Sequence, residues 1–384
     1  MQIINYNKHF VDSKDIKAVT NSLKGKSLTQ GKELITFEKN LKKKFKAKFC
    51  LAVSSGTAAL HLSLLALKLK RKDIVCSSPI SFLAGANMVH NCGGKNVFID
   101  IDPKTNNIDP DRLEKFLSKK KIKAVMATDY GGYPCDWKKL KYLSKKYNFY
   151  LINDNCHAIG SKYFGDIGYA AKYADLVTHS YHAIKNITTG EGGSILTNSK
   201  FFYEKIKILR NHGLLKVSKN LDNSNWPFKL NAYGFNYRLT DLQSALGSSQ
   251  LKKLAKFCKK RNFIAKIYSD TLKNNKFIEL PENKNYIYNS FHLFPIKIHF
   301  SKLKLNKKLF INKLKKKGII IQVHYYPINK HKLHKGINYN IKLNQTNQFH
   351  DTAVSLPIFY SLTKNKVHKI CKIIDKVINN YKKK

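Results

Sequence analysis

Short runs of apolar residues alternate with longer amphipathic segments through the first two-thirds of the chain. The strand candidates are Phe49–Val53, Asp73–Ser77, Asn96–Ile101, Ile122–Thr128, Phe149–Asp154, Ala174–Ser180 and Gly193–Thr197. Several of them are largely apolar, which is typical of strands that are covered on both faces. Between them lie segments such as Thr57–Leu69 and Trp137–Lys146, in which apolar residues recur at helical spacing. This alternation predicts an α/β layered domain with a mostly parallel sheet.

The pattern changes after about residue 250. There we expect a long basic helix, a strand, a helix, a further strand and a closing helix. These elements cover, in order, Gln250–Asn274, Phe291–Ile298, Lys308–Lys317, Ile319–His324 and Asn365–Tyr381. We therefore predict two domains, in which residues 1–250 form a large domain with an N-terminal segment and residues 251–384 form a smaller α+β domain.

The composition is that of a folded protein from a reducing compartment. The 384 residues are 43% hydrophobic, and no run approaches the ~18 apolar residues that a membrane span requires. The start of the chain lacks the basic and apolar layout of a secretory signal. The seven cysteines are an odd number without a C-x-x-C pair, which argues against a disulfide framework and against a structural zinc site. We expect a cytoplasmic protein with neither a membrane anchor nor a metal site.

The charge is strongly basic, because 71 Lys and Arg residues face 24 Asp and Glu residues, a net charge of +47. Such a balance raises the prospect of a nucleic-acid or anionic-membrane partner. The lysines, however, are spread over the whole chain in short clusters, with no long basic tail. We interpret them as solvated faces and expect no specific nucleic-acid partner. A positive surface would also speed the capture of a negatively charged nucleotide.

The first candidate for a site is the segment Ser54–Leu60, which lies where a strand ends and a helix begins. Free backbone N–H groups at a helix N-terminus form a phosphate cradle, and Gly56 with Thr57 allows a close approach. The alternative is simple capping of the helix by a hydroxyl, which is common without any ligand.

The second candidate is an aspartate that closes an apolar strand, Asp154, with His157 three residues later. Ligands of α/β folds bind at this edge of the sheet. The alternative is that Asp154 only caps the element that follows it.

The third candidate is Lys185, which follows a predicted buried strand ending at Ser180 and precedes a glycine-rich segment. A lysine in so basic a chain is usually a solvated surface group. This position instead predicts a partly desolvated amine, whose pKa falls so that it is nucleophilic near neutral pH. A phosphate cradle, a strand-end carboxylate and such an amine are together what a pyridoxal-phosphate site requires.

The sequence resembles the DegT/DnrJ/StrS family of sugar-nucleotide aminotransferases over nearly its whole length. The blocks that carry the resemblance are Leu28–Gly31, Val53–Leu60, Ser78–Asn87, Cys92–Pro110, Ser180–Gly193, Gly234–Leu246, Gln322–Pro327 and Ser355–Ile358. The resemblance implies fold-type I, as in aspartate aminotransferase, with a large sheet domain and a smaller α+β C-terminal domain. It also implies an α/β fold, pyridoxal 5'-phosphate as the cofactor, and a transferase activity that moves an amino group.

The resemblance implies roles for the residues around the cofactor ring. Lys185 matches the lysine that binds the cofactor covalently and later moves a proton, and Asp154 matches the carboxylate that pairs with the ring nitrogen. His157 occupies the position that contacts the ring hydroxyl, and Phe82 the aromatic position that packs on the ring. The family usually has Glu where this chain has Asn153, a departure that removes no group expected to do chemistry.

The resemblance also implies how the phosphate is held. Gly56, Thr57 and Ser180 match its ligands within one chain. Asn236, in the block G-F-N-Y-R, matches the asparagine that reaches the phosphate of the neighbouring subunit. The expected assembly is therefore a homodimer with shared active sites.

Within the family, several blocks resemble the pseudaminic-acid branch, among them HAIKNITTGEGG and VHYYP. This implies transfer of an amino group from L-glutamate to a UDP-linked 4-keto-6-deoxy-N-acetyl sugar, with Thr29, Gln30 and His324 as candidates for the sugar pocket. The alternatives are another nucleotide keto sugar, of the perosamine, bacillosamine or 3-keto type. From another class, a basic nucleic-acid-binding or regulatory protein on the same fold stays open.

Overall fold

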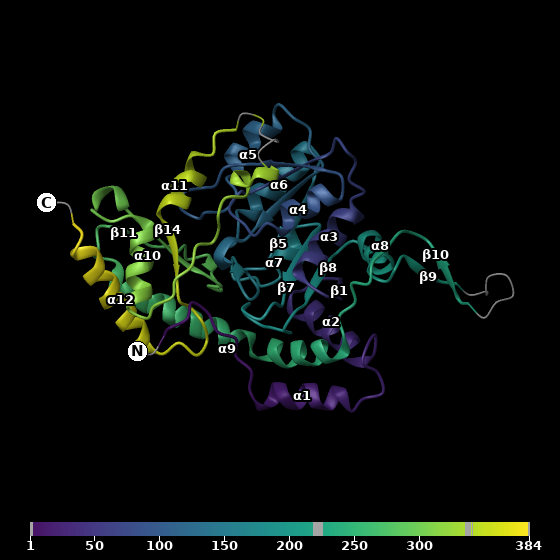
Figure 1. Ribbon diagram of the computed structural model, residues 1–384. Helices are drawn as coiled ribbons and strands as arrows, with labels where there is room; N and C mark the ends of the chain where they lie inside the picture. Colours follow the sequence, from purple (N-terminus) through teal and green to yellow (C-terminus); the bar gives the residue numbers. More distant parts are fainter. Residues whose placement is uncertain (1–2, 218–225, 335–338, 340, 383–384) are drawn as a thin grey trace.

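The computed structural model describes residues 3–217, 226–334, 339 and 341–382. Its largest element is a seven-stranded sheet in the order β1-β8-β7-β5-β4-β2-β3 (Figure 1). The strands are β1 (Phe49–Val53), β2 (Ile74–Ser77), β3 (Lys95–Phe98), β4 (Ala124–Thr128), β5 (Tyr150–Asp154), β7 (Leu176–Ser180) and β8 (Gly193–Thr197). Strand β8 is antiparallel to both of its neighbours, and the other pairings are parallel. The mostly parallel sheet predicted from the apolar runs is confirmed, with strand ends that differ by a few residues.

Helices cover both faces of this sheet, which explains why its strands are almost entirely buried. One face packs against α3 (Gly56–Ala66), α4 (Ala84–Asn91) and α8 (Lys200–Arg210). The other packs against α2 (Lys32–Lys44), α5 (Pro110–Leu117), α6 (Trp137–Tyr147) and α7 (Tyr169–Tyr173). Helix α3 is buried on almost every side, so its N-terminus is held firmly at the edge of the sheet.

The long helix α9 (Asp241–Leu272) joins the two hydrophobic cores. It begins nine residues before the predicted start at Gln250, because Thr240 and Gln243 form a reciprocal capping box. Its first half packs against α2 and against α1 (Ser13–Leu23), which runs beside it (Figure 1). The buried apolar side chains of α9 as far as Cys258 belong to the core of the large sheet, and those of α9 from Ile264 onward belong to the second core. The division of the chain after residue 250 stays a proposal.

The second core is built from a three-stranded antiparallel sheet and two helices. The sheet order is β11 (Ile278–Glu279), β13 (Phe294–Ile298) and β14 (Ala353–Leu356), and the helices are α10 (Lys307–Lys316) and α12 (Lys364–Asn379). The predicted strand Ile319–His324 is wrong. Ile319 pairs with Ile4 and Gln322 with Ser355, so the segment forms two isolated bridges with different neighbours instead of one continuous ladder.

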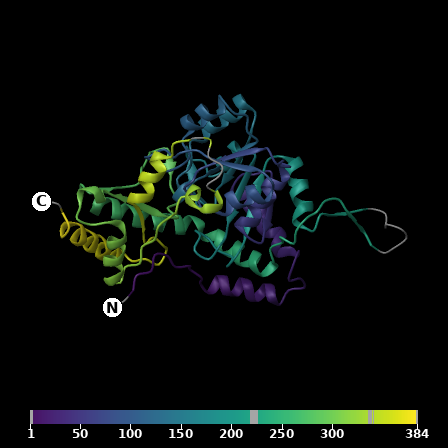
Figure 2. The ribbon, with the colours of Figure 1, turned by 45° about the horizontal axis from the view of Figure 1, so that its top comes forward.

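Smaller elements complete the fold. Strands β6 (Lys162–Tyr163) and β12 (Ile287–Tyr288) form one antiparallel pair, and β9 (Leu214–Lys216) and β10 (Phe228–Leu230) form another. The β9–β10 pair extends away from the body of the molecule in both views (Figures 1 and 2). Among the described residues, no helix combines the length and apolar character needed to cross a membrane.

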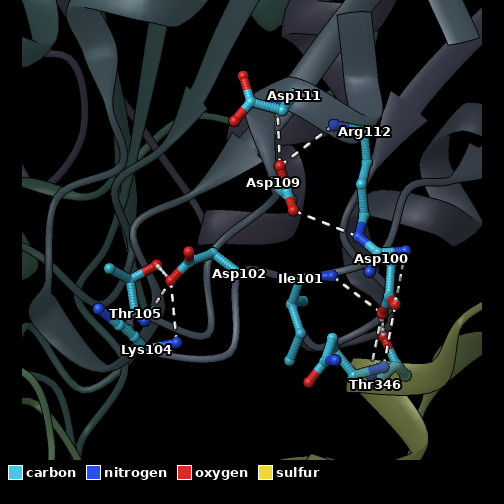
Figure 3. Close-up of polar contacts among 10 residues, drawn as sticks. Asp100, Ile101, Asp102, Lys104, Thr105, Asp109, Asp111, Arg112 and Thr346 are labelled. Atoms are coloured by element: carbon cyan, nitrogen blue, oxygen red, sulfur yellow. Dashed lines mark hydrogen bonds and ion pairs between the residues drawn. The ribbon is translucent and has the colours of Figure 1, made fainter. Parts of the chain in front are cut away.

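Asp100, just beyond β3, ties the large sheet to α11 (Asn344–Thr352) (Figure 3). One carboxylate oxygen accepts from the backbone N–H and the hydroxyl of Thr346 at 2.8 and 2.7 Å, and the other from the N–H of Gln345 at 3.0 Å. The residue that precedes α11, Leu343, has no side-chain cap to offer. The fully buried Asp100 therefore caps this helix from a distance of more than two hundred residues, and Arg112 balances its charge at 3.6 Å.

We expect Asp100→Asn to lower the free energy of unfolding by about 2–3 kcal/mol, because an amide nitrogen cannot accept the N–H groups of α11. Urea denaturation measures this change. Asp111→Asn is the matched control, since the Asp111 side chain is 80% exposed and its loss should stay within about 0.5 kcal/mol. Equal stability of the two variants would contradict the capping role.

Candidate active site

A cavity of about 420 Å³ lies where β5 and β7 end opposite the N-terminus of α3. Eight of the eleven site residues predicted from the sequence line it: Gly56, Thr57, Phe82, Asp154, His157, Ser180, Lys185 and His324. Ligand sites of open α/β sheets lie at this end of the strands. The fold thus brings together side chains that are up to 268 residues apart in the chain, from Gly56 to His324.

The N-terminus of α3 offers two backbone donors to the cavity. Ser55 caps the helix, because its Oγ accepts from the N–H of Ala58 at 3.0 Å. In the described part of the chain no group accepts from the N–H of Gly56 or Thr57. A Cβ on residue 56 would lie 2.7 Å from the Cβ of Ser180, so only glycine permits this approach of helix to strand. The arrangement is a cradle for a phosphate group.

Asp154 is 7% exposed at the end of β5, and each of its carboxylate oxygens has a donor. Thr128 Oγ1 donates to Oδ2 at 3.2 Å, and the backbone N–H of Cys156 donates to Oδ1 at 3.2 Å. The carboxylate is therefore held in one orientation at the wall of the cavity.

A second buried carboxylate, Asp129, holds the residues on either side of Asp154. Its Oδ2 accepts from the side-chain amides of Asn153 at 3.2 Å and Asn155 at 2.9 Å. Its other donors are Cys135 N–H, Trp137 Nε1–H and the Tyr169 hydroxyl. Burial raises the pKa of Asp129, and these donors oppose the rise. The amide of Asn153 suits this position because it donates to Asp129, whereas a glutamate would bring a second carboxylate toward Asp129.

Lys185 lies in the loop between β7 and β8. Its backbone N–H donates to the carbonyl of His182 at 2.9 Å, and the side chain of Asn7 donates to the carbonyl of Ile184 at 3.2 Å. Burial lowers the pKa of Lys185 below that of an ordinary lysine, and the nearby Cys156 and Asp154 oppose this shift. A larger share of the amine is consequently neutral and nucleophilic near pH 7.

Burial keeps two histidines of the cavity, His157 and His324, in their neutral form. The N–H of Gly131 donates to Nδ1 of His157 at 3.4 Å, which leaves Nε2–H to donate to the Tyr325 hydroxyl at 2.9 Å. Burial and then the charge of Lys185 hold the pKa of His157 well below its usual range. The same two causes lower the pKa of His324 to about 4, and its Nδ1 lies 2.9 Å from Ser355 Oγ.

Phe82 supplies an aromatic face to the cavity. Its side chain is 57% exposed although it lines the cavity, and its ring centroid lies 6.0 Å from that of Tyr325. An exposed phenyl ring beside a phosphate cradle and an amine is suited to stacking on a planar ligand.

A model of the DegT/DnrJ/EryC1/StrS aminotransferase family matches residues 10–375. The chain belongs to this family. It is a pyridoxal-phosphate-dependent sugar aminotransferase. The aminotransferase is 37% identical over 357 residues to the UDP-4-amino-4,6-dideoxy-N-acetyl-beta-L-altrosamine transaminase of Campylobacter jejuni strain 81-176, with 92% of each chain covered.

Two further similarities involve Helicobacter pylori. Its transaminase of the same name is 34% identical to this aminotransferase over 384 residues, with 98% of each chain covered. The solved structure of Helicobacter pylori PseC, an aminotransferase involved in the biosynthesis of pseudoaminic acid, has a TM-score of 0.89 and 34% identity. That comparison covers 99% of this chain and 100% of PseC, so the fold-type I architecture is confirmed.

Three predicted site residues of the aminotransferase lie outside the cavity. Thr29, Gln30 and Asn236 are exposed, and none of them lines it. Thr29 pairs with Thr240 at the start of α9, and Asn236 pairs with Asn211. Within one chain, the fold does not place these three residues beside the eight predicted residues that line the cavity.

The cavity also contains residues that the sequence did not single out for the site. Tyr6 reaches it from the N-terminal segment, and its ring centroid lies 5.2 Å from that of His324. His292 is 2% exposed and lies 4.7 Å from His157 between ring centroids, and its Nδ1 has no hydrogen-bond partner among the residues that the structure describes. His292 lies outside the blocks that carry the family resemblance, in the segment Phe291–Pro295 (FHLFP), which resembles the pseudaminic-acid branch, whereas nothing in the sequence near Tyr6 indicates a site.

The backbone and side-chain groups that line the cavity fit pyridoxal phosphate. The N–H groups of Gly56 and Thr57 would hold the phosphate, Asp154 the ring nitrogen and Phe82 one ring face, and Lys185 would supply the amine. These groups come from a helix start, a strand end and two loops around one cavity.

We expect Gly56→Ala to weaken cofactor binding at least tenfold and to lower stability by about 1–3 kcal/mol, because the added methyl group meets Ser180. Titration with pyridoxal phosphate and thermal denaturation measure the two effects. In the double variant Gly56→Ala, Ser180→Gly, removal of the opposing Cβ should restore most of the stability. A single variant as stable as the wild type would contradict the close packing.

Proposed function

We propose that this aminotransferase moves the amino group of L-glutamate to a UDP-linked 4-keto-6-deoxy-N-acetyl sugar, in the manner of pseudaminic-acid biosynthesis. The observation that carries the proposal is the meeting of Lys185 and Asp154 in one cavity beside the start of α3. We infer the proposed substrate from the two altrosamine transaminases and from PseC, to which the chain is similar over almost its whole length.

Lys185 is the proton carrier of this proposal. Bound pyridoxal phosphate holds the amino group between the two half-reactions and stabilises the negative charge left when a carbon–hydrogen bond breaks. The Nζ of Lys185 takes the proton from the α-carbon of glutamate and later gives one to the former keto carbon of the sugar. Its lowered pKa suits it to both tasks, because a larger share of the neutral amine is present to accept a proton than in an ordinary lysine.

Asp154 and His157 line the cavity that would hold the cofactor ring. The charge of Asp154 would hold the ring nitrogen in its protonated form, which would make the ring a better electron acceptor. His157 stays neutral because of burial and the charge of Lys185, so it would add no positive charge beside the ring. Its contact with Tyr325 fixes the plane of the imidazole.

The homodimer is part of the proposal. Thr29, Gln30 and Asn236 are exposed in one chain but belong to blocks shared with the family. We infer that a second subunit receives them, with Asn236 at the phosphate and Thr29 and Gln30 near the sugar. His324 supplies the sugar contact from within the chain, because it lines the cavity beside Tyr6.

Other keto sugars remain the second candidate. Sugars of the perosamine, bacillosamine or 3-keto type differ from the proposed substrate by few groups, and one group changes binding by only about 1–3 kcal/mol. A screen of nucleotide keto sugars against the glutamate-treated protein separates these candidates.

Absorbance spectroscopy tests the proposed function. The purified protein should carry a yellow band that moves to shorter wavelength when L-glutamate is added, and borohydride should fix the cofactor to the peptide that contains Lys185. Lys185→Ala should lose turnover by a factor of at least about 10²–10⁴, because proton transfer by a placed group is worth that much. A colourless protein that takes up no pyridoxal phosphate would overturn the proposal.

Complementation tests the shared active site. Lys185→Ala and Asn236→Asp should each be nearly inactive, the second because a carboxylate repels the phosphate. If the two residues meet across a dimer, mixing and subunit exchange should restore about a quarter of wild-type activity, since half of the dimers then hold one intact site of two. Mixtures no more active than the separate variants would place both residues in one chain.

A further inference from the structure

We propose that Thr128, supported by Ser81, is a positioning residue that orients the carboxylate of Asp154 toward the cofactor ring. The inference rests on the role proposed for Asp154 in the preceding subsection. It adds two hydroxyl groups to the site, neither of which touches the reacting atoms.

The sheet places Thr128 and Asp154 side by side. They are the last residues of β4 and β5, and they are paired partners in the parallel register of these strands. Paired residues of neighbouring strands point to the same face, so the Thr128 hydroxyl reaches Asp154 without leaving the strand. Thr128 Oγ1 donates to Oδ2 at 3.2 Å, and the N–H of Cys156 donates to Oδ1 at 3.2 Å.

Ser81 completes a directed chain of hydrogen bonds. Its Oγ lies 3.1 Å from Thr128 Oγ1, and both side chains are buried. Because a carboxylate only accepts, the Thr128 proton goes to Asp154 and the Ser81 hydroxyl donates to Thr128. Hydrogen bonds arranged in series strengthen one another in a buried site. Ser81 also precedes Phe82, so one turn of chain serves both the aromatic face and the carboxylate.

The chain of hydroxyls has a consequence for the orientation of Asp154. A donor aimed at a carboxylate oxygen restricts the rotation of the carboxylate. Without Thr128 Oγ1, Oδ2 would have no donor among the described residues, and the carboxylate could turn toward the amine of Lys185, which its charge already attracts. Thr128 therefore directs the negative charge to the ring nitrogen.

Two variants of the full-length protein test the inference. Thr128→Val keeps the shape and removes the hydroxyl, whereas Thr128→Ser keeps the hydroxyl. For the apo-protein titrated with pyridoxal phosphate, we expect the valine variant to raise Kd about tenfold, the loss of one hydrogen bond to a charged group. The visible band of the bound cofactor should change as well. The serine variant should stay within about threefold of the wild type in Kd and keep the wild-type band.

Asp154→Asn and the melting temperature of each apo-protein are the controls. If Asp154→Asn changes Kd and the band but Thr128→Val changes neither, the inference is wrong and the proposed function stands. If Asp154→Asn itself leaves both unchanged, the proposed role of Asp154 fails first. A valine variant that melts earlier as apo-protein, yet binds with wild-type Kd and band, would make Thr128 a stabilising residue only and overturn the positioning role.

Discussion

A carboxylate that is buried at the end of a strand must find hydrogen-bond donors, and this requirement shapes the site around Asp154. Burial of an ionised group without partners costs several kcal/mol, so the neighbouring elements must supply polar contacts at that point. Thr128 and the N–H of Cys156 meet the two oxygens directly. The flanking asparagines are held in turn by Asp129, which is itself surrounded by donors. Asp154 is thus surrounded by two layers of polar contacts, its own donors and then the contacts that hold its two neighbours in the chain.

The cavity around Asp154 is completed by distant parts of the chain. The N-terminal segment brings Tyr6 to it, the segment between α10 and α11 brings His324 and Tyr325, and the loop before β13 brings His292. Buried Arg261 of α9 donates to the carbonyls of His292 and Ile358, so the helix that joins the two cores also anchors this side of the cavity. The site depends on the relative placement of both cores.

The sequence was sufficient for those parts of the fold that local patterns determine. Apolar runs located the strands of the large sheet, and the chemistry of strand ends and helix starts pointed to Asp154, Gly56 and Lys185. Strand order is not local, however, and the pairing of Thr128 with Asp154 exists only because β4 and β5 are neighbours. The contribution of Tyr6 and the two bridges that replace the strand at Ile319–His324 likewise depend on long-range packing. The capping box at Thr240 was readable from the sequence and would have placed the start of α9 correctly.

The use of acidic residues as internal acceptors has a consequence for the exterior. Asp100 and Asp129 accept from backbone and side-chain donors inside the fold, and Asp241 accepts from the N–H groups of Gly31 and Leu34. Carboxylates in such positions are held in the interior and are poorly placed to offset the lysines that face solvent. The net charge of +47 is therefore expressed mainly at the surface, and dissolved salt, which screens this charge, sets how closely two such molecules approach.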